Sequence, residues 1–317
     1  MPYGALLFPG LPRQNIGAGI QTDFGTIVGV GGKVVAYVHH SGAAVTDDQA
    51  IASMTLKTLN QALALCRSGK NDTVIVLPGH AENISSADQM SSLKAGTQIV
   101  GVGSQNNRPT FTWTAATSTF LLDAANVSLS NLILNMDPGT GSVNVAAPIT
   151  VSAAGCALRN CKIRMGTDAN SLVTIGITTT AAADDFEITN CEIYGATAAE
   201  CTTMIQFVGA DRLKFIGNTV VGATSNAAVG VIRFLTTAST DIKMIDNVVR
   251  NNKALSTLVI TGMAGISGEV DYLFMVGLSD TGLTTFFGTP ASICFGANTY
   301  VANLVGERAA LFGTAST

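Results

Sequence analysis

Charged side chains are scarce in this chain of 317 residues. Asp, Glu, Lys and Arg make up 12% of it, whereas they make up about 25% of a typical soluble protein. The net charge of −4 offers no basic surface to a phosphate backbone, so we expect no nucleic-acid partner. A surface with so little charge is typical of a β-rich fold that exposes Thr, Ser, Asn and Gly, or of a protein covered by neighbouring subunits.

Long apolar runs and metal-binding patterns are missing as well. No run of about 18 apolar residues exists, so we expect no membrane span. The N-terminal stretch MPYGALLFPGLPRQ has no basic region and is interrupted by Pro9 and Pro12, which argues against a secretory signal and favours assembly in the cytoplasm. There are three histidines and no Cys-x-x-Cys pair, so we assign neither a metal site nor a cofactor site. The six cysteines are Cys66, Cys156, Cys161, Cys191, Cys201 and Cys294.

An internal repeat is present instead. Five similar segments each carry an asparagine, with spacings of 29, 30, 28 and 29 residues. These anchors are Asn131, Asn160, Asn190, Asn218 and Asn247. A repeat of this length is the signature of a solenoid, in which each repeat forms one coil of a stack.

The apolar residues around each anchor indicate a bend in the chain. In the first three repeats they occupy positions −4 and −2 before the asparagine and +1 and +3 after it, as with Ile188 and Cys191 around Asn190. A continuous strand keeps a period of two, so the chain must turn a corner at the anchor. Asn tolerates the left-handed backbone of such a corner, and its side chain can bond to the Asn of the next coil. The pattern predicts a parallel β-helix with a ladder of five stacked asparagines.

Three details follow from this register. Around Asn218 and Asn247 the apolar residues fall at −5, −3 and −2, which we interpret as an extra residue or bulge before the corner. The outward residues Lys162 and Glu192 are expected to form an ion pair between adjacent coils. The inward residues Cys161 and Cys191 are expected to stack as thiols in a reducing compartment.

Four regions are predicted along the chain. Residues 1–45 form an N-terminal arm that anchors the protein and contains one or two short strands. Residues 46–69 contain an amphipathic helix, from Thr46 to Cys66 with a Thr46/Gln49 capping box, which covers the open end of the stack. Residues 70–276 form the parallel β-helix, and residues 277–317 form a closing segment and tail.

Glycan cleavage is the enzymatic alternative, since it needs two carboxylates a short distance apart. The acidic candidates lie near the coil corners, where such residues are also common turn formers: Asp184, Asp185, Glu187, Glu192, Asp211 and Asp241. The chain has one Trp and five Tyr, and only Tyr194 is close to these acids, so aromatic sugar platforms are few. The histidines His39, His40 and His80 do not suggest a chelating pair or a base. We therefore assign no catalytic residue and expect no enzymatic activity.

The segments NDTVIVLPGHAENI (71–84) and AGTQIVGVGSQNNRPTFTW (95–113), followed by the Asn-anchored coils, resemble the right-handed parallel β-helix of the pectate lyase and phage tailspike superfamily. The LPGHAE stretch and the ending NTYVANLVGERAALFGTAST are more narrowly similar to β-helical structural proteins of tailed phages, including capsid decoration proteins. The resemblance covers roughly residues 46 to 317.

This resemblance implies a homotrimer on the virion surface. As a decoration protein it would bind the major capsid protein and stabilise the shell, using Pro2 to about Val45, without nucleic acid, membrane, metal or cofactor. The alternative is a tailspike-like receptor-binding protein, which would bind a cell-surface glycan and cut it. The absence of an evident head-binding domain favours the decoration protein.

Overall fold

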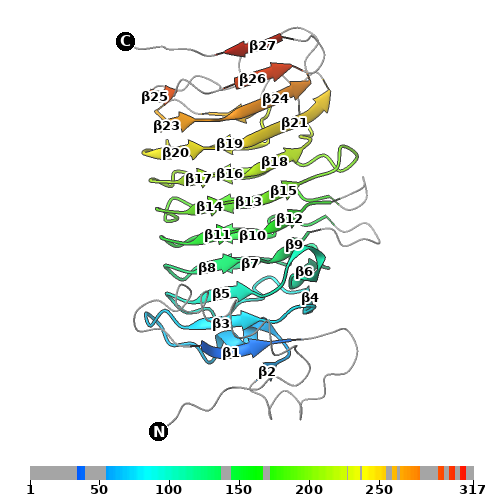
Figure 1. The fold of residues 1–317 in the computed structure, drawn as a ribbon, viewed down its shortest axis with the longest axis vertical. Helices are drawn as coiled ribbons and strands as arrows, with labels where there is room; N and C mark the ends of the chain where they lie inside the picture. Colours follow the sequence, from blue (N-terminus) through cyan, green and yellow to red (C-terminus); the bar gives the residue numbers. More distant parts are fainter. Residues whose placement is uncertain are drawn as a thin grey trace.

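The chain folds into a parallel β-solenoid, shown by a computed structural model (Figure 1). The structure describes residues 34–39, 55–136, 144–166, 172–226, 228–235, 238–254, 259–262, 265–278, 292–295, 300–303 and 308–311. The strands stack into three sheets, here named A, B and C, and the chain visits them in that order in each coil. Six coils have a strand in every sheet, from coil 1 (β5, β6, β7) to coil 6 (β20, β21, β22). The expectation of an all-β parallel solenoid is confirmed.

Sheet A has the order β2-β1-β3-β5-β8-β11-β14-β17-β20-β23-β25, and all its pairs are parallel. Its strands are β1 (Val34–Val38), β2 (Thr55–Leu56), β3 (Thr73–Val76), β5 (Gln98–Gly101), β8 (Ser128–Ser130), β11 (Ala157–Arg159), β14 (Glu187–Thr189), β17 (Lys214–Ile216), β20 (Ile242–Ile245), β23 (Ser267–Asp271) and β25 (Ser292–Phe295).

Sheet B has the order β27-β26-β24-β21-β18-β15-β12-β9-β6-β4. Its strands are β4 (Ala81–Ile84), β6 (Thr110–Trp113), β9 (Ile133–Asn135), β12 (Lys162–Arg164), β15 (Glu192–Tyr194), β18 (Thr219–Gly222), β21 (Val248–Ala254), β24 (Phe274–Leu278), β26 (Tyr300–Asn303) and β27 (Arg308–Leu311). The last pair, β26 with β27, is antiparallel.

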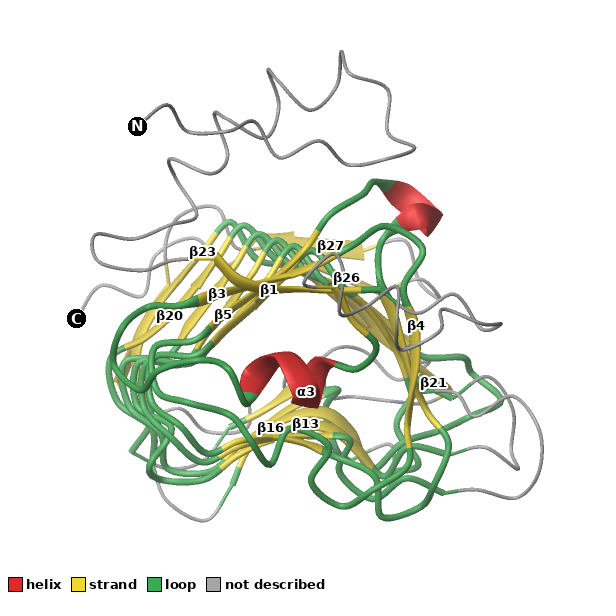
Figure 2. Cartoon of the chain, turned by 90° about the horizontal axis from the view of Figure 1, so that it is seen from below, coloured by secondary structure: helices red, strands yellow, loops and turns green. Residues whose placement is uncertain are grey.

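Sheet C has the order β22-β19-β16-β13-β10-β7. Its strands are β7 (Phe120–Leu122), β10 (Ile149–Val151), β13 (Ile175–Thr179), β16 (Thr203–Phe207), β19 (Ile232–Phe234) and β22 (Ile260–Thr261). Seen along the stack, the three sheets enclose one elongated interior (Figure 2).

The interior is filled by the inward residues of all three sheets. Along β20 the exposed Lys243 lies between the buried Ile242 and Met244, which is the alternation expected of a strand with one face in the core. Trp113 is fully buried, its ring centroid lies 4.9 Å from that of Phe120, and its Nε1 donates to the Pro148 carbonyl. Burial of each such aromatic side chain contributes about 1.5–3 kcal/mol to stability.

The helix at the N-terminal end is shorter than the sequence predicts. Helix α3 (Leu59–Leu63) begins after the N-cap Thr58, whose capping-box partner is Gln61. The expectation of a helix through Thr55–Leu56 is therefore wrong, since these residues pair in sheet A as β2, and the proposed Thr46/Gln49 capping box lies outside the described residues. The other helical segment described is a 3-10 turn, η1 (Gln105–Asn107).

Helix α3 lies across the end of the coil stack, inside the outline of the three sheets (Figure 2). Leu59, Ala62 and Leu63 are fully buried and belong to the same core as the coils. Among the described residues, no helix has the length and apolar character needed to cross a membrane.

Two observations concern the predicted regions, the first of which was expected to contain one or two short strands. Val34–Val38, which we assigned to the arm, is a strand of sheet A between β2 and β3, while residues 1–33 and 40–54 lie outside the described part. The parallel stacking also continues beyond residue 276, because β25 extends sheet A and β26 extends sheet B.

Candidate functional site

The corner between sheets A and B is where the sequence placed its asparagine ladder. Asn131, Asn160 and Asn190 have φ values of 58°, 51° and 54°, so each occupies the left-handed region that the predicted bend requires. In the next three coils the equivalent left-handed residues are Gly217, Asp246 and Tyr272, with φ values of 68°, 56° and 48°.

Asn218 and Asn247 therefore lie one residue after the corner, and the single ladder of five is wrong. The strands before this corner pair with no register shift, so there is no bulge. Counted from Gly217, the apolar residues Leu213 and Phe215 fall at −4 and −2, as in the earlier coils. Asn218 and Asn247 are buried and stand in the inward column of Cys161 and Cys191.

The asparagines form two separate sets of hydrogen bonds. In the outer set, the Asn160 Nδ2 donates to Asn131 Oδ1 at 3.1 Å, and the Asn131 Nδ2 donates to the Gly101 carbonyl at 2.8 Å. In the inner set, Asn247 Oδ1 accepts from both the backbone N–H and the Nδ2 of Asn218, at 2.9 and 3.1 Å. Asn218 Oδ1 in turn accepts from the Cys191 N–H at 2.9 Å. Both sets tie consecutive coils together.

The two predicted pairs of the third and fourth coils are adjacent as expected. Lys162 and Glu192 are partners in register, with 3.6 Å between Nζ and Oε2. Cys161 and Cys191 are both buried and both free thiols. The Cys161 N–H donates to the Cys191 sulfur at 3.4 Å. The hydrogen bond shared with Cys161, together with burial, holds the pKa of Cys191 well above its ordinary value.

The corner between sheets C and A has its own column of left-handed residues, which the sequence analysis did not identify. In seven consecutive coils these are Asn71, Gly96, Asn126, Gly155, Asp185, Arg212 and Asp241. In the first four of these coils the signal in the sequence was a Gly or Asn two residues before the sheet A strand. Three of the residues in this column carry charge, and they bring the acidic candidates together with a base.

The acidic candidates at this corner are held by Arg212 and by backbone amides. The Arg212 guanidinium binds Asp185 through two hydrogen bonds of 2.8 and 2.9 Å and approaches Asp184 Oδ2 at 3.3 Å. Asp184 Oδ1 accepts from the Asp211 N–H, and Asp211 Oδ1 accepts from the Thr240 N–H. The hydrogen bonds from Arg212 lower the pKa of Asp185.

Glu187 is engaged in the same way on the outer face of sheet A. The Arg159 guanidinium of the preceding coil binds both carboxylate oxygens, at 3.0 and 2.9 Å, and the Thr189 hydroxyl adds a bond of 3.0 Å. The hydrogen bonds from Arg159 lower the pKa of Glu187 despite its partial burial. Of the six acidic candidates, only Asp241 has no side-chain hydrogen bond or ion pair among the described residues.

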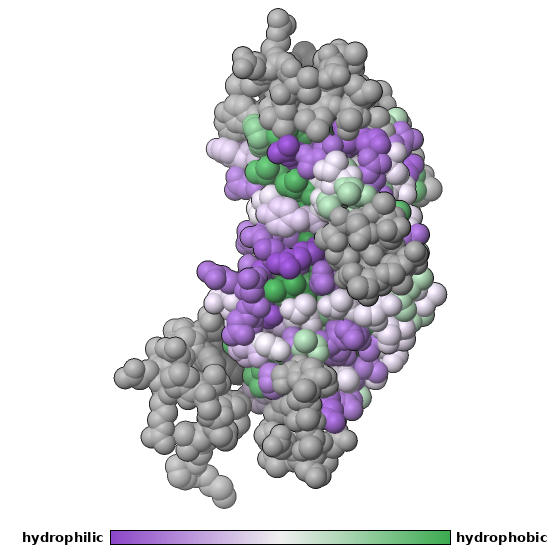
Figure 3. Space-filling model, turned by 90° about the vertical axis from the view of Figure 1, so that its right-hand side faces the viewer, coloured by the Kyte–Doolittle hydropathy of each residue, from purple (hydrophilic) through white to green (hydrophobic). Residues whose placement is uncertain are grey.

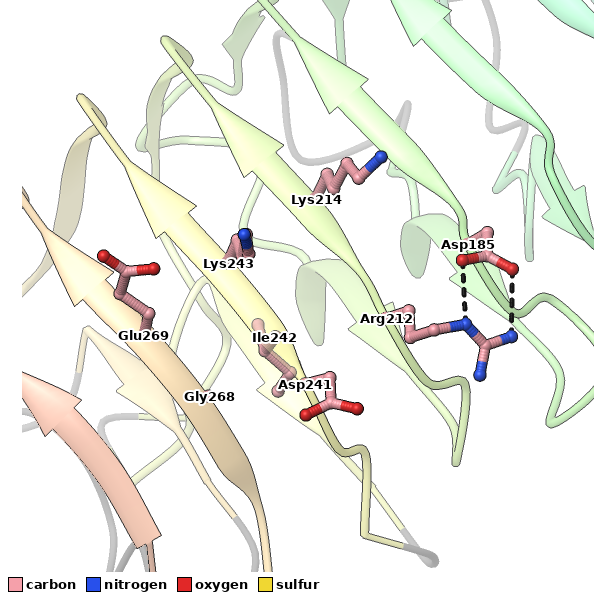
Figure 4. A pocket seen from close by; sticks show the side chains of 8 residues that line it. All are labelled: Asp185, Arg212, Lys214, Asp241, Ile242, Lys243, Gly268 and Glu269. Carbon is pink, nitrogen blue, oxygen red and sulfur yellow. Dashed lines mark hydrogen bonds and ion pairs between the residues drawn. The ribbon is translucent and has the colours of Figure 1, made fainter.

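A shallow pocket of about 460 Å³ opens beside this corner, across β17, β20 and β23 (Figure 4). It is lined by Asp185, Arg212, Lys214, Asp241, Ile242, Lys243, Gly268 and Glu269. Lys214, Lys243 and Glu269 form one row, since they are register partners on adjacent strands. Within the described ranges, none of these three forms an ion pair.

The chemistry available in the pocket is limited by exposure and by charge balance. Its three acids and three bases cancel, and all six are exposed to solvent. Asp241 and Glu269 are therefore surrounded by solvent and charged side chains and not by the apolar residues that typically surround a general acid. Trp113 is buried in the core far along the chain from this corner and offers no sugar platform here. The pocket is a mixed-charge surface rather than an assembled acid–base pair.

Of the three histidine candidates, His39 and His80 lie near the N-terminal end of the stack. His80 is fully buried, and its Nε2 lies 3.1 Å from Glu82 Oε2, which also accepts from the Leu59 N–H at 2.8 Å. Sequence analysis missed Glu82, which occupies an inward position of β4 and ties that strand to the start of α3. His39 follows β1, and His40 lies outside the described residues. In the described part of the chain, no group of three or more His, Cys, Asp or Glu side chains could hold a metal ion.

Comparison with known proteins adds no relative. No protein-family model matches the chain, and neither the curated proteins nor the solved structures contain a match. The parallel β-solenoid and the contacts between its coils are therefore the basis for assigning a function.

Proposed function

We propose that this chain is a structural, non-catalytic protein of a virion: a trimeric capsid decoration protein that binds the major capsid protein and stabilises the shell. It would assemble in the host cytoplasm and reside on the capsid surface. Right-handed coiling is expected, because parallel strands are joined almost always by right-handed crossovers. The observation that carries the proposal is the use of the acidic side chains to join coils.

Five of the six acidic candidates take part in contacts between coils instead, and Asp241 is the exception among the described residues. Asp185 is bound by Arg212 from the following coil, and Glu187 is bound by Arg159 from the preceding coil. A carboxylate whose oxygens are both held by a guanidinium is a poor nucleophile and a poor proton donor. The geometry supports a role in which the prism is kept straight and rigid.

A rigid prism suits a protein that stabilises an assembled shell. A decoration protein that binds the assembled shell in preference to its free subunits lowers the free energy of the shell. This stabilisation grows with the logarithm of the concentration of the decoration protein. A solenoid with continuous ladders through six coils changes shape little on binding, so it loses little conformational entropy. Closed symmetric oligomers of such prisms match the symmetric positions of a shell.

The second candidate is a tailspike-like receptor-binding protein that recognises a glycan. One observation favours it: the solvent-open pocket beside β17, β20 and β23 contains carboxylates and ammonium groups that could bind sugar hydroxyls. Exposed Tyr194, with the Lys162 Nζ 6.0 Å from its ring centroid, lies on β15 of sheet B, two residues after Glu192, and does not line this pocket.

Three measurements on the full chain separate the two candidates. We expect sedimentation to give a trimer, bare capsids to melt at a higher temperature when the protein is added, and capsular or O-antigen polysaccharides to release no reducing ends. The Arg212→Ala variant, which frees Asp185, is expected to release none either. Polysaccharide cleavage, or electron cryo-microscopy that locates the protein at the tail tip, would overturn the decoration role.

A further inference from the structure

The outward residues beside the corner between sheets A and B are polar or charged in coils 3 and 4 and largely apolar in the following coils. Two columns show this: the last residue of each sheet A strand and the first residue of each sheet B strand. In coils 3 and 4 they hold Arg159, Thr189, Lys162 and Glu192. In the following coils they hold Ile216, Ile245, Val248 and Phe274, interrupted by Thr219 and Asp271. The outward positions belong to the same kind of strand in all these coils, so they have the same preference for strand-forming residues. That preference therefore does not explain why only the later coils expose apolar residues.

We name the apolar residues of these columns, together with the corner residue Tyr272, the corner strip: Ile216, Ile245, Val248, Tyr272 and Phe274. Val248 and Phe274 are register partners on β21 and β24, and Tyr272 is the corner residue two positions before Phe274. Val248 and Phe274 are each 40% exposed and Tyr272 is 55% exposed. Figure 3, which faces sheet B, shows hydrophobic side chains gathered toward the upper part of this side, among hydrophilic neighbours.

Charges of opposite sign lie on either side of Val248, which belongs to the strip. Asp246, at the corner, Val248 and Arg250 point outward in turn from the same coil, so an acid and a base lie on opposite sides of the apolar residue. The Asp246 side chain is exposed. The Arg250 side chain is partly exposed, so its positive charge can be approached from solvent.

We propose that the corner strip is the surface by which this chain binds a second copy of itself. In a closed ring with parallel solenoid axes, equivalent coils lie at the same height. The side of Val248 that carries Asp246, the acidic edge, then faces the side that carries Arg250, the basic edge, of the next copy. Asp246 of each copy then meets Arg250 of its neighbour, and the apolar strip is covered between them. This inference rests on the homo-oligomer of the proposed function and names the surface that forms it.

Self-complementary charge is what favours a second copy over another protein. A partner with a different sequence would need a base opposite Asp246 and an acid opposite Arg250, whereas a neighbouring copy supplies both at the required coil height. The apolar side chains of the corner strip lose water on association, which provides the main driving force.

The first test removes the apolar contact. Val248→Asp and Phe274→Asp are compared with Asn83→Asp, which adds the same charge at an exposed outward position of β4. Val248→Thr and Phe274→Thr are milder versions, and Thr219 shows that this column accepts threonine. By analytical ultracentrifugation we expect the wild type and Asn83→Asp to be oligomers, the Asp variants to be monomers, and the Thr variants to dissociate at least tenfold more readily. Unchanged circular dichroism and melting of the dissociated protein establish that each variant is folded.

The second test exchanges the two charges. Asp246→Arg and Arg250→Asp are each expected to weaken the oligomer at least tenfold, and the double variant is expected to restore it. Arginine is acceptable at a left-handed corner of this chain, since Arg212 has φ 55°. A double variant as weak as the single ones would overturn the pairing of the two edges.

The outcomes also separate this inference from the proposed function. If the wild type is a trimer and every strip substitution leaves it trimeric, the corner strip is not the interface, whereas the proposed trimer is retained. A different oligomer that the strip substitutions dissociate would support the strip and contradict the trimer. A monomeric wild type at micromolar concentration would overturn both, whereas polysaccharide cleavage by an oligomer that depends on the strip would overturn only the decoration role.

Discussion

The side-chain oxygen of Asn126 occupies the space that a side chain on Gly155, in the next coil, would need. The same relationship joins Asn71 with Gly96 and Asn190 with Gly217. Each of these three asparagines has the left-handed conformation and is followed in the next coil by a Gly in that conformation. At these three places, the missing side chain of Gly leaves room for the Asn of the neighbouring corner.

Gly155→Ala is expected to destabilise the fold by about 1–3 kcal/mol, because alanine is strained at φ 71° and its Cβ would collide with Asn126. Urea unfolding followed by circular dichroism measures the change. Gly195→Ala is the matched control, since its Cβ would meet only ordinary contacts of 3.5 Å or more. Adding Asn126→Gly to Gly155→Ala should recover the part of the loss due to the collision. Equal unfolding midpoints for both alanine variants would contradict the stacking argument.

Asn247→Leu is expected to cost about 2–4 kcal/mol, although leucine stands at equivalent positions in other coils. Asn247 is buried and satisfies the Asn218 N–H with its Oδ1 and the Phe215 carbonyl with its Nδ2. The substitution leaves both groups buried without a partner, at about 1–3 kcal/mol each. Asn190→Gly, at an exposed corner, should change the unfolding free energy by less than about 0.5 kcal/mol. If both substitutions have the same small effect, the inner asparagines do not join the coils.

The Arg159–Glu187 pair is expected to give an acid-dependent contribution to stability. Arg159 lowers the pKa of Glu187 in the folded protein, so folding favours the ionised carboxylate. The contribution is complete above the unfolded pKa of about 4.3 and is lost as the pH falls through the lower folded value. Glu187→Gln should therefore reduce stability at pH 7, by no more than about 1 kcal/mol for such a half-exposed pair. Denaturant unfolding at several pH values should show this difference shrinking below pH ~4, and a difference that persists in acid would rule out the ion pair as its source.

Buried cysteines are expected to be unreactive in the native protein. Burial raises the pKa of Cys201 to about 12 and that of Cys66 to about 11. At pH 8 the thiolate of Cys201 is then about 10⁻⁴ of the thiol, and thiolate is the form that alkylates. Iodoacetamide should label neither residue until urea is added, as peptide mass spectrometry would show. Rapid native labelling of Cys201 would mean that the coil around β16 opens readily.

The fold could be predicted largely because corner chemistry and strand periodicity agree. Asn160 and Asn190 mark real corners, and the pairing of Lys162 with Glu192 followed from counting residues alone. The error at Asn218 arose because asparagine suits two different environments. It tolerates a left-handed corner, and it can also satisfy backbone groups inside the core. The preceding Gly217, together with the apolar phase, was the signal that distinguished the two.

The cap and the surface sites could not be predicted to the same degree. Thr46/Gln49 and Thr58/Gln61 both fit a capping box, and sequence alone does not reveal that Thr55–Leu56 pairs with β1. The pocket beside Arg212 is formed by side chains of several coils, and its charges depend on which carboxylate the arginine binds. Neither could be read from the sequence. The corner strip became visible only when outward columns were compared coil by coil, because each of its residues is unremarkable within its own strand.

The antiparallel pairing of β27 with β26 has a consequence for association along the solenoid axis. Up to β26, each strand of sheet B offers the next coil an edge for a parallel partner, and a foreign coil could add there as another step. Strand β27 runs the opposite way, so at this sheet the edge no longer has the polarity of the repeat. The direction of one short strand thus interrupts, at sheet B, the parallel repeat that another coil would have to continue.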